Sequence, residues 1–147
     1  IMLDYAHSPE SLENILQSAK EYTLGKVICV FGCGGNRDKN KRPLMGEISG
    51  RISDYTIITS DNPRNEEPKE IINEIEEGIK KTKACYKVIV DRKEAIKYAM
   101  ENAQKGDIIL LIGKGHENYQ EIKGVKYPWD ERKAVKEAEE EINEHMA

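Results

Sequence analysis

The 147-residue sequence predicts an α/β fold, a doubly wound and mostly parallel sheet with helices on both faces. Three observations support this prediction. Strand-like apolar runs alternate with amphipathic segments along most of the chain. The strand-like runs are continuously apolar, as is typical of parallel strands that are buried on both faces. The alternation stops near Glu117, after which two short runs around Gly124 predict a small antiparallel hairpin.

The elements of the first third of the chain follow in order. Residues 1–3 are a short apolar strand fragment. Ser8 and Pro9 form an N-cap followed by proline at the first helical position, so a helix begins there and ends near Gly25. Residues 26–31 are apolar after Lys26 and predict a buried strand.

The middle of the chain repeats this pattern. Pro43 opens a second helix, and residues 55–60 predict the next strand. Pro68 opens a third helix rich in isoleucine. A short strand at residues 88–90 precedes Asp91, which begins a fourth helix in the manner of a capping box.

The last third predicts one more sheet strand and then a different architecture. Residues 108–112 are the most apolar run of the chain. Residues 119–122 and 125–127 predict the antiparallel hairpin, and Asp130 caps a final, highly charged helix. We therefore expect one domain over residues 1–147.

Composition excludes several classes of protein. A formal net charge of -4 and a pI near 5.5 argue against a nucleic-acid-binding module. No run of 18 apolar residues and no signal-like start is present, so we expect no membrane partner and a cytoplasmic location. Cys29, Cys33 and Cys85 lack the spacing of a zinc or redox motif, so we expect free thiols. The abrupt apolar start suggests that residue 1 lies inside a longer polypeptide.

Three polar loops follow strand-like runs and are the candidate functional segments. They are residues 32–42, residues 61–64 and residues 113–117. The carboxyl ends of parallel strands lie at one edge of a sheet, which is where open α/β sheets bind ligands. We therefore expect the three loops to form one site.

The loop at residues 32–42 combines glycines with four basic residues between Arg37 and Arg42. Glycine leaves backbone N–H groups free to approach an anion, and no requirement of the fold explains so much positive charge. The loop is neither a Walker A motif nor a dinucleotide fingerprint. A glycine turn followed by a solvated charged run is the alternative, and the position after a strand favours binding.

The segment Asp61-Asn62-Pro63-Arg64 places a cation at the end of a strand. Pro63 restricts the backbone, and the planar guanidinium of Arg64 suits a carboxylate ligand. An ordinary turn is the alternative interpretation.

The segment Gly113-Lys114-Gly115-His116-Glu117 predicts a sharp turn that directs Glu117 toward a ligand amine, with a solvent-exposed turn as the alternative. No second histidine follows at the spacing of a zinc protease, so we expect no metal site. His7, next to the end of the first strand, is either a packing residue or part of the site.

Taken together, these loops and the segments Asp4 to Pro9 and Lys41 to Met45 resemble the C-terminal domain of the Mur ligases. Within that family they are most similar to the branch that adds meso-diaminopimelate to UDP-N-acetylmuramoyl-L-alanyl-D-glutamate. The resemblance covers nearly the whole chain, and the motifs occur in the same order. It implies an ATP-dependent amide ligase of bacterial peptidoglycan synthesis.

The resemblance also implies roles for individual residues. Asp4 and His7 are expected at the ATP site. The expected ligands of diaminopimelate are Arg37, Asp61, Asn62, Arg64, Gly113 and Glu117. The phosphate-binding loop, the Mg²⁺ ligands and the nucleotide-sugar pocket of the family lie in two upstream domains that this sequence lacks, so the chain alone is expected to be inactive.

Two alternatives to diaminopimelate addition remain. The first is a Mur ligase that adds lysine, although Arg64 favours a substrate with an additional carboxylate. The second is a stand-alone doubly wound module that binds an anionic amino acid without transforming it.

Overall fold

The computed structural model of the chain describes residues 1–35, 39–115 and 117–146. Five parallel strands form one sheet in the order β1-β5-β2-β3-β4. These strands are β1 (Met2–Asp4), β2 (Val27–Phe31), β3 (Tyr55–Ile58), β4 (Tyr86–Val88) and β5 (Ile108–Ile112). The predicted doubly wound α/β class is confirmed.

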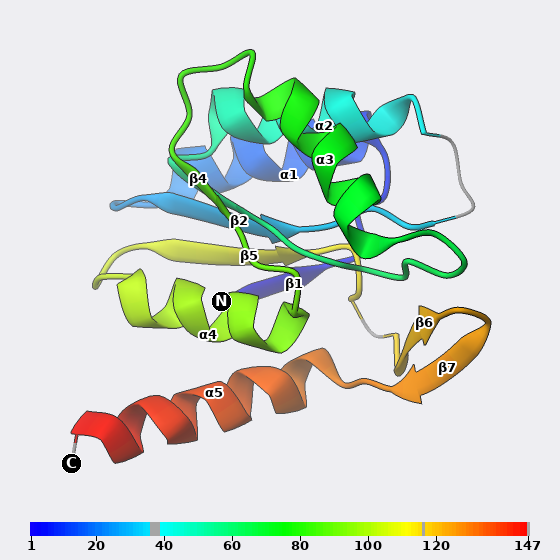
Figure 1. Cartoon of the computed structure of the whole chain (residues 1–147). Coiled ribbons are helices and arrows are strands. Elements are labelled where there is room, and N and C mark those ends of the chain that lie inside the picture. Colours follow the sequence, from blue (N-terminus) through cyan, green and yellow to red (C-terminus); the bar gives the residue numbers. More distant parts are fainter. Residues whose placement is uncertain (36–38, 116, 147) are drawn as a thin grey trace.

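Helices cover both faces of this sheet (Figure 1). One face carries α1 (Pro9–Tyr22), α2 (Lys41–Ile52) and α3 (Pro68–Ile79). The other carries α4 (Arg92–Asn102), with α5 (Glu131–Met146) packed beyond it. The continuous apolar strands explain this three-layer arrangement, because each strand has side chains to bury on both sides.

The central strand β2 shows how the two cores are built. Cys29 and Phe31 lie in the core beneath α1, α2 and α3, whereas Ile28 and Val30 lie in the core beneath α4. Successive residues of a strand point to opposite faces of the sheet. Because helices cover both faces, all four side chains are buried. Burial raises the pKa of the Cys29 thiol to about 12, which is consistent with an unreactive packing residue.

The helix starts follow the predicted capping residues. The Ser8 hydroxyl accepts a hydrogen bond from the Ser11 backbone N–H at 3.1 Å, and Pro9 is the first residue of α1. Asp91 caps α4 and Asp130 caps α5 in the same way. The three cysteines are free thiols, as expected.

Several predicted boundaries were wrong. The strand predicted at residues 55–60 ends at Ile58. The helix α2 begins at Lys41 and not at Pro43, because Asn40 already has helical backbone angles. The strand β4 spans Tyr86–Val88 and not residues 88–90. The carbonyl of Val90 instead accepts hydrogen bonds from the hydroxyls of Thr59 and Ser60, so the chain leaves the ladder there.

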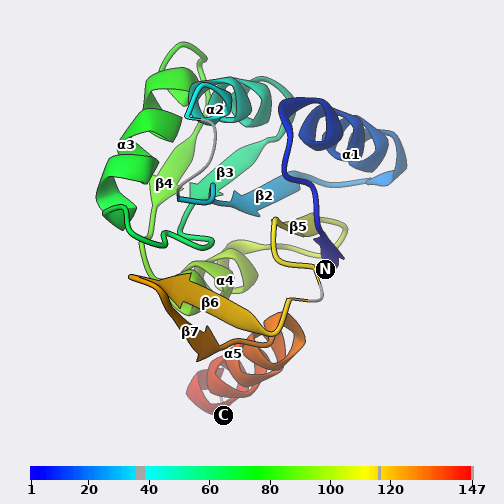
Figure 2. The same ribbon diagram turned by 90° about the vertical axis from the view of Figure 1, so that its right-hand side faces the viewer.

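The predicted hairpin consists of β6 (Tyr119–Ile122) and β7 (Val125–Pro128), joined through Lys123 and Gly124. Both turn residues have positive φ, which glycine adopts without strain. The hairpin lies at the end of the sheet where β5 leaves (Figure 2). Among the described residues, no helix combines the length and the apolar character that crossing a membrane requires.

Candidate amino-acid site at the carboxyl edge of the sheet

The predicted loops converge because four strands end in register. Asp4 pairs with Ile112, which also pairs with Phe31, and Phe31 pairs with Ile58. The loop after β2 continues to the face that carries α2, whereas the loop after β5 continues toward the hairpin and α5 (Figure 2). Neighbouring loops that separate to opposite faces leave a crevice at the sheet edge.

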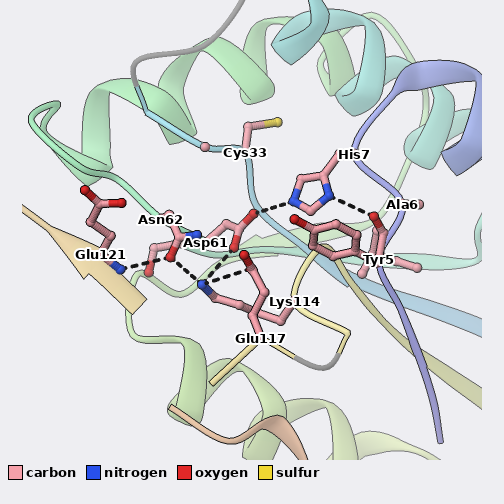
Figure 3. Close-up of polar contacts among 12 residues, drawn as sticks. Tyr5, Ala6, His7, Cys33, Asp61, Asn62, Lys114, Glu117 and Glu121 are labelled. Atoms are coloured by element: carbon pink, nitrogen blue, oxygen red, sulfur yellow. Dashed lines mark hydrogen bonds and ion pairs between the residues drawn. The ribbon is translucent and has the colours of Figure 1, made fainter. Parts of the chain in front are cut away.

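Asp61 is the buried centre of this crevice, with only 1% of its side chain exposed. Its Oδ2 lies 3.3 Å from Nε2 of His7 and its Oδ1 lies 3.1 Å from Nζ of Lys114 (Figure 3). Neither carboxylate oxygen makes an aligned hydrogen bond within the described residues. Burial opposes the charge, but the contact with His7 and the charges of Arg92 and Lys114 outweigh it, so the pKa of Asp61 falls to about 2.

The backbone orients His7 toward this carboxylate. Its Nδ1–H donates to the carbonyl of Tyr5 at 2.8 Å, which leaves Nε2 facing Asp61 (Figure 3). About a third of the His7 side chain is exposed, so the ring lies at the mouth of the crevice.

Lys114 is fully buried and holds the acidic groups together. Its ammonium donates to the side-chain oxygen of Asn62 and, at 2.9 Å, to the carbonyl of Tyr119. It also lies 3.6 Å from Oε1 of Glu117 (Figure 3). Burial lowers the pKa of Lys114 despite the two carboxylates, because taking an ammonium out of water favours its neutral form.

The turn after β5 needs glycine. Gly113 has a φ of 109°, and a Cβ there would lie 3.3 Å from Oδ2 of Asp61. Its backbone N–H donates to the carbonyl of Asp4 at 2.8 Å. The turn brings Glu117 into the crevice, where its Oε1 is buried without a hydrogen bond to a described residue.

Arg64 also lines the crevice and is 15% exposed. Its Nη1 donates to the carbonyl of Gly35 at 2.9 Å, and its Nε lies 3.3 Å from Oε1 of Glu121. The hairpin holds its backbone, because the Arg64 N–H donates to the Glu121 carbonyl at 2.9 Å. Arg64 has a φ of 53°, an unusual value for a side chain other than glycine.

The loop after β2 is anchored by an arginine that has a structural role. Arg42 is fully buried, donates to the Gly34 carbonyl at 2.9 Å and pairs with Glu66 and Glu74 at 2.7 and 2.6 Å. The expectation that no fold requirement explains the basic residues of this loop was therefore wrong for Arg42. Lys41 contacts the crevice differently, since its Nζ donates to the His7 carbonyl at 2.9 Å.

Together these groups enclose a cavity of about 230 Å³. It is lined by Tyr5, His7, Gly34, Lys41, Asp61, Asn62, Arg64 and Glu117. The lining combines the carboxylates of Asp61 and Glu117 with the guanidinium of Arg64 and the ammonium of Lys41, so the cavity complements a ligand that carries both an amine and a carboxylate.

The predicted site residues divide into three groups. Asp61, Asn62, Arg64, Glu117 and His7 line the cavity, and Gly113 supports it through its backbone. Asp4 is close by, but its carboxylate accepts the Ala6 N–H at 2.8 Å and shapes the loop that carries His7. Arg37 lies outside the described residues.

Sequence reasoning missed the central role of Lys114. Its signal was a single lysine between two glycines after the most apolar strand, a position that burial makes costly unless carboxylates pair with it. Tyr5 and Lys41 were also missed as lining residues.

His7, Asp61 and Glu117 place three potential metal-ligand atoms within 4.8 Å of one another. Two of these residues already face the ammonium of Lys114. A divalent cation would meet repulsion from that charge, so the group is better suited to an ammonium than to a metal ion.

A doubly wound sheet with a polar cavity at its carboxyl edge is an arrangement that binds small ligands, and comparison with known proteins shows the family. Residues 1–115 match the family model described as "Mur ligase, glutamate ligase domain". The chain belongs to the Mur ligase family.

Individual proteins of this family are also similar to the chain. The chain is 60% identical over 137 residues to the UDP-N-acetylmuramoyl-L-alanyl-D-glutamate–2,6-diaminopimelate ligase of Caldanaerobacter subterraneus subsp. tengcongensis, covering 93% of this chain and 28% of that protein. It is 59% identical over 122 residues to the ligase of the same name from Alkaliphilus metalliredigens, covering 83% and 25%. A solved structure of a ligase of that name superposes with a TM-score of 0.90 at 43% identity, over 96% of this chain and 29% of the other. The chain thus spans about a quarter of the length of these relatives.

Proposed function

We propose that this chain is the C-terminal, amino-acid-binding domain of an ATP-dependent amide ligase. The reaction would add meso-diaminopimelate to UDP-N-acetylmuramoyl-L-alanyl-D-glutamate in peptidoglycan synthesis, in the cytoplasm. The observation that carries the proposal is the cavity that Arg64 lines together with the buried acceptors of Asp61 and Glu117. The names of the relatives support the choice of diaminopimelate.

The carboxylates and Arg64 recognise opposite ends of a zwitterion. Asp61 and Glu117 retain acceptor capacity for a substrate ammonium, and burial strengthens such a bond. Arg64 binds a substrate carboxylate, and Arg37 is expected to assist. Asn62 contributes indirectly, because its side-chain oxygen fixes Lys114 and accepts the Glu121 N–H at 2.9 Å.

In the proposed reaction the substrate amine attacks the carbonyl carbon of an acyl phosphate, forming the amide and releasing phosphate. This chain binds and orients that amine. Asp61 has a pKa of about 2, which makes it a weak general base, so it holds the amino group and does not take its proton.

ATP and Mg²⁺ are the proposed cofactors. His7 lies at the mouth of the cavity, where its ring could contact a nucleotide, and Asp4 fixes the loop that carries it. The pairing of Lys114 with Asp61 and Glu117 leaves this domain poorly suited to hold Mg²⁺, so we assign the metal ligands to the upstream domains. Those domains are the expected intramolecular partners, and they would also bind the nucleotide dipeptide.

Phosphate release by the complete ligase tests this function, with meso-diaminopimelate and L-lysine offered separately. Arg64→Ala should raise the KM for diaminopimelate roughly 30-fold to several thousand-fold, as the loss of about 2 to 5 kcal/mol from a buried charge pair implies. The KM for ATP should change little. Arg51→Ala is the matched control, because Arg51 is an exposed arginine whose ion pair with Glu13 lies away from the cavity.

The outcomes separate the alternatives. Preference for lysine would retain the family and reject the assignment of Arg64 to a second carboxylate. Absence of turnover with both amino acids would favour a module that only binds an anionic amino acid. Equal damage to the use of ATP and diaminopimelate by Arg64→Ala would reject the role given to this residue.

A further inference from the structure

We propose that Arg92 is a positioning residue that sets the spacing between the two substrate-binding loops. It is the first residue of α4 and lies on the face of the sheet opposite to α1, α2 and α3. Its Nη1 donates to the carbonyl of Ser60 at 3.2 Å, and its Nη2 donates to the carbonyl of Ile112 at 3.1 Å. Ser60 and Ile112 directly precede Asp61 and Gly113, so one guanidinium holds the starting points of both loops.

The backbone ladder does not link these loops directly. They leave β3 and β5, which are separated by β2 in the sheet order. The ladder connects β3 and β5 only through β2, where Phe31 pairs with both Ile58 and Ile112. Arg92 supplies a direct connection at that point, where the distance from Asp61 to Glu117 decides how an ammonium is bound.

A second buried side chain fixes the guanidinium itself. Nε and Nη2 of Arg92 donate to the two oxygens of Glu131 at 2.9 and 2.7 Å, and both side chains are fully buried. The indole N–H of Trp129 donates to the same carboxylate at 3.1 Å. Glu131 is the first residue of α5, so this helix locks Arg92 in one orientation.

Stability alone does not account for this pair. The desolvation of two buried charges offsets much of their attraction, and a well-packed apolar pair is often equally stable. The guanidinium instead provides what apolar side chains and lysine lack, which is a rigid planar set of donors that reaches Glu131 and both carbonyls together. The charge of Arg92 also helps to hold the pKa of Asp61 low.

The inference extends the proposed function, because it concerns the same amino-acid site. Arg92→Lys in the complete ligase keeps the charge and removes the fork. We expect the KM for diaminopimelate to rise about ten-fold or more, as for a small misplacement of binding groups, with the KM for ATP nearly unchanged. In the ligand-free protein, amide hydrogen exchange in residues 59–66 and 113–122 should become faster.

Lys93→Met is the matched control. Lys93 follows Arg92 in α4 and also links it to α5, through Glu137 at 2.8 Å, but it does not contact the two carbonyls. This variant weakens the contact between the helices and should leave both the KM for diaminopimelate and the exchange of the loops unchanged. Loop exchange that accelerates equally in the two variants would mean that docking of α5 alone holds the loops, which would overturn the proposal.

The double variant Arg92→Met/Glu131→Leu covers the case in which Arg92→Lys does not fold. It leaves no unpaired buried charge and still removes the connection to Ser60 and Ile112. We expect the same faster exchange in both loops. A folded double variant with native exchange and a native KM would reject the positioning role.

The two readouts distinguish the two proposals. Wild-type enzyme that does not use diaminopimelate contradicts the proposed function, whereas the exchange measurement judges Arg92 without any substrate.

Discussion

Individual side chains at the carboxyl edge of the sheet carry charges that burial would normally suppress. Asp61 keeps a low pKa because the His7 ring contacts its carboxylate and the charges of Arg92 and Lys114 lie nearby. Lys114 is accepted in the interior because Asp61 and Glu117 face its ammonium. Removing one member of this group leaves the others unpaired in a low-dielectric environment, so the residues act as a unit.

The low pKa of Asp61 predicts a pH dependence of stability. A carboxyl whose pKa falls from 3.8 to about 2 on folding stabilises the folded state above pH ~4, and this contribution is lost as the pH falls toward 2. Asp61→Asn should therefore lower the free energy of unfolding by about 2 kcal/mol at pH 7 and by much less at pH 2. Urea unfolding at both pH values measures this difference. A deficit that is the same at both values would contradict the assigned charge state.

At the scale of elements, the contact between α2 and α3 depends on glycines. A Cβ at Gly46 would lie 2.1 Å from the carbonyl oxygen of Ile75, and one at Gly78 would lie 1.7 Å from that of Pro43. The backbones of the two helices therefore touch directly. This close contact brings Glu74 of α3 to Arg42, which anchors the loop after β2.

Gly46→Ala and Gly78→Ala should each destabilise the protein by about 1 to 3 kcal/mol, because the helices must move apart. Alanine has the higher helix propensity, so propensity alone predicts a gain of about 1 kcal/mol in each case. Chemical unfolding decides between the two signs. Asn73→Ala on the exposed side of α3 is the control and should be neutral or slightly stabilising. A stabilised Gly78→Ala variant would mean that the helices are less closely packed.

At the scale of the whole molecule, the sheet divides the interior into two cores. Ile75 of α3 lies in the core on one face, and Ile96 of α4 lies in the core on the other. Both side chains are fully buried, and the sheet lies between them. The carboxyl edge is where the two layers meet, since Arg92 reaches the ends of β3 and β5 from the face that carries α4.

Ile75→Val and Ile96→Val should each cost about 0.5 to 1.5 kcal/mol, because each removes one buried methyl group. The double variant should show the sum to within about 0.5 kcal/mol, since residues without shared contacts act independently. A thermodynamic cycle from urea unfolding provides the test. A coupling energy above 1 kcal/mol would show that the sheet transmits strain between the cores.

The sequence by itself determined the order of strands and helices along the chain, the caps at Ser8, Asp91 and Asp130, and the edge of the sheet at which the loops of the candidate site meet. These features are local, because they depend on periodicity, on capping residues and on the shared direction of parallel strands. The sequence placed the boundaries of several helices and strands wrongly. Val90 leaves the sheet because the hydroxyls of Thr59 and Ser60, which follow β3, donate to its carbonyl, and its apolar side chain gives no sign of that contact.

Only the tertiary structure showed which charged residues are buried at the candidate site. Lys114 meets Asn62 across 52 positions of the sequence, and Arg92 meets Glu131 across 39. In the sequence these residues resemble solvated charges, since no local pattern separates a buried lysine or arginine from an exposed one. Their burial follows from which strand ends and helix starts meet at one edge, and long-range packing alone sets those distances.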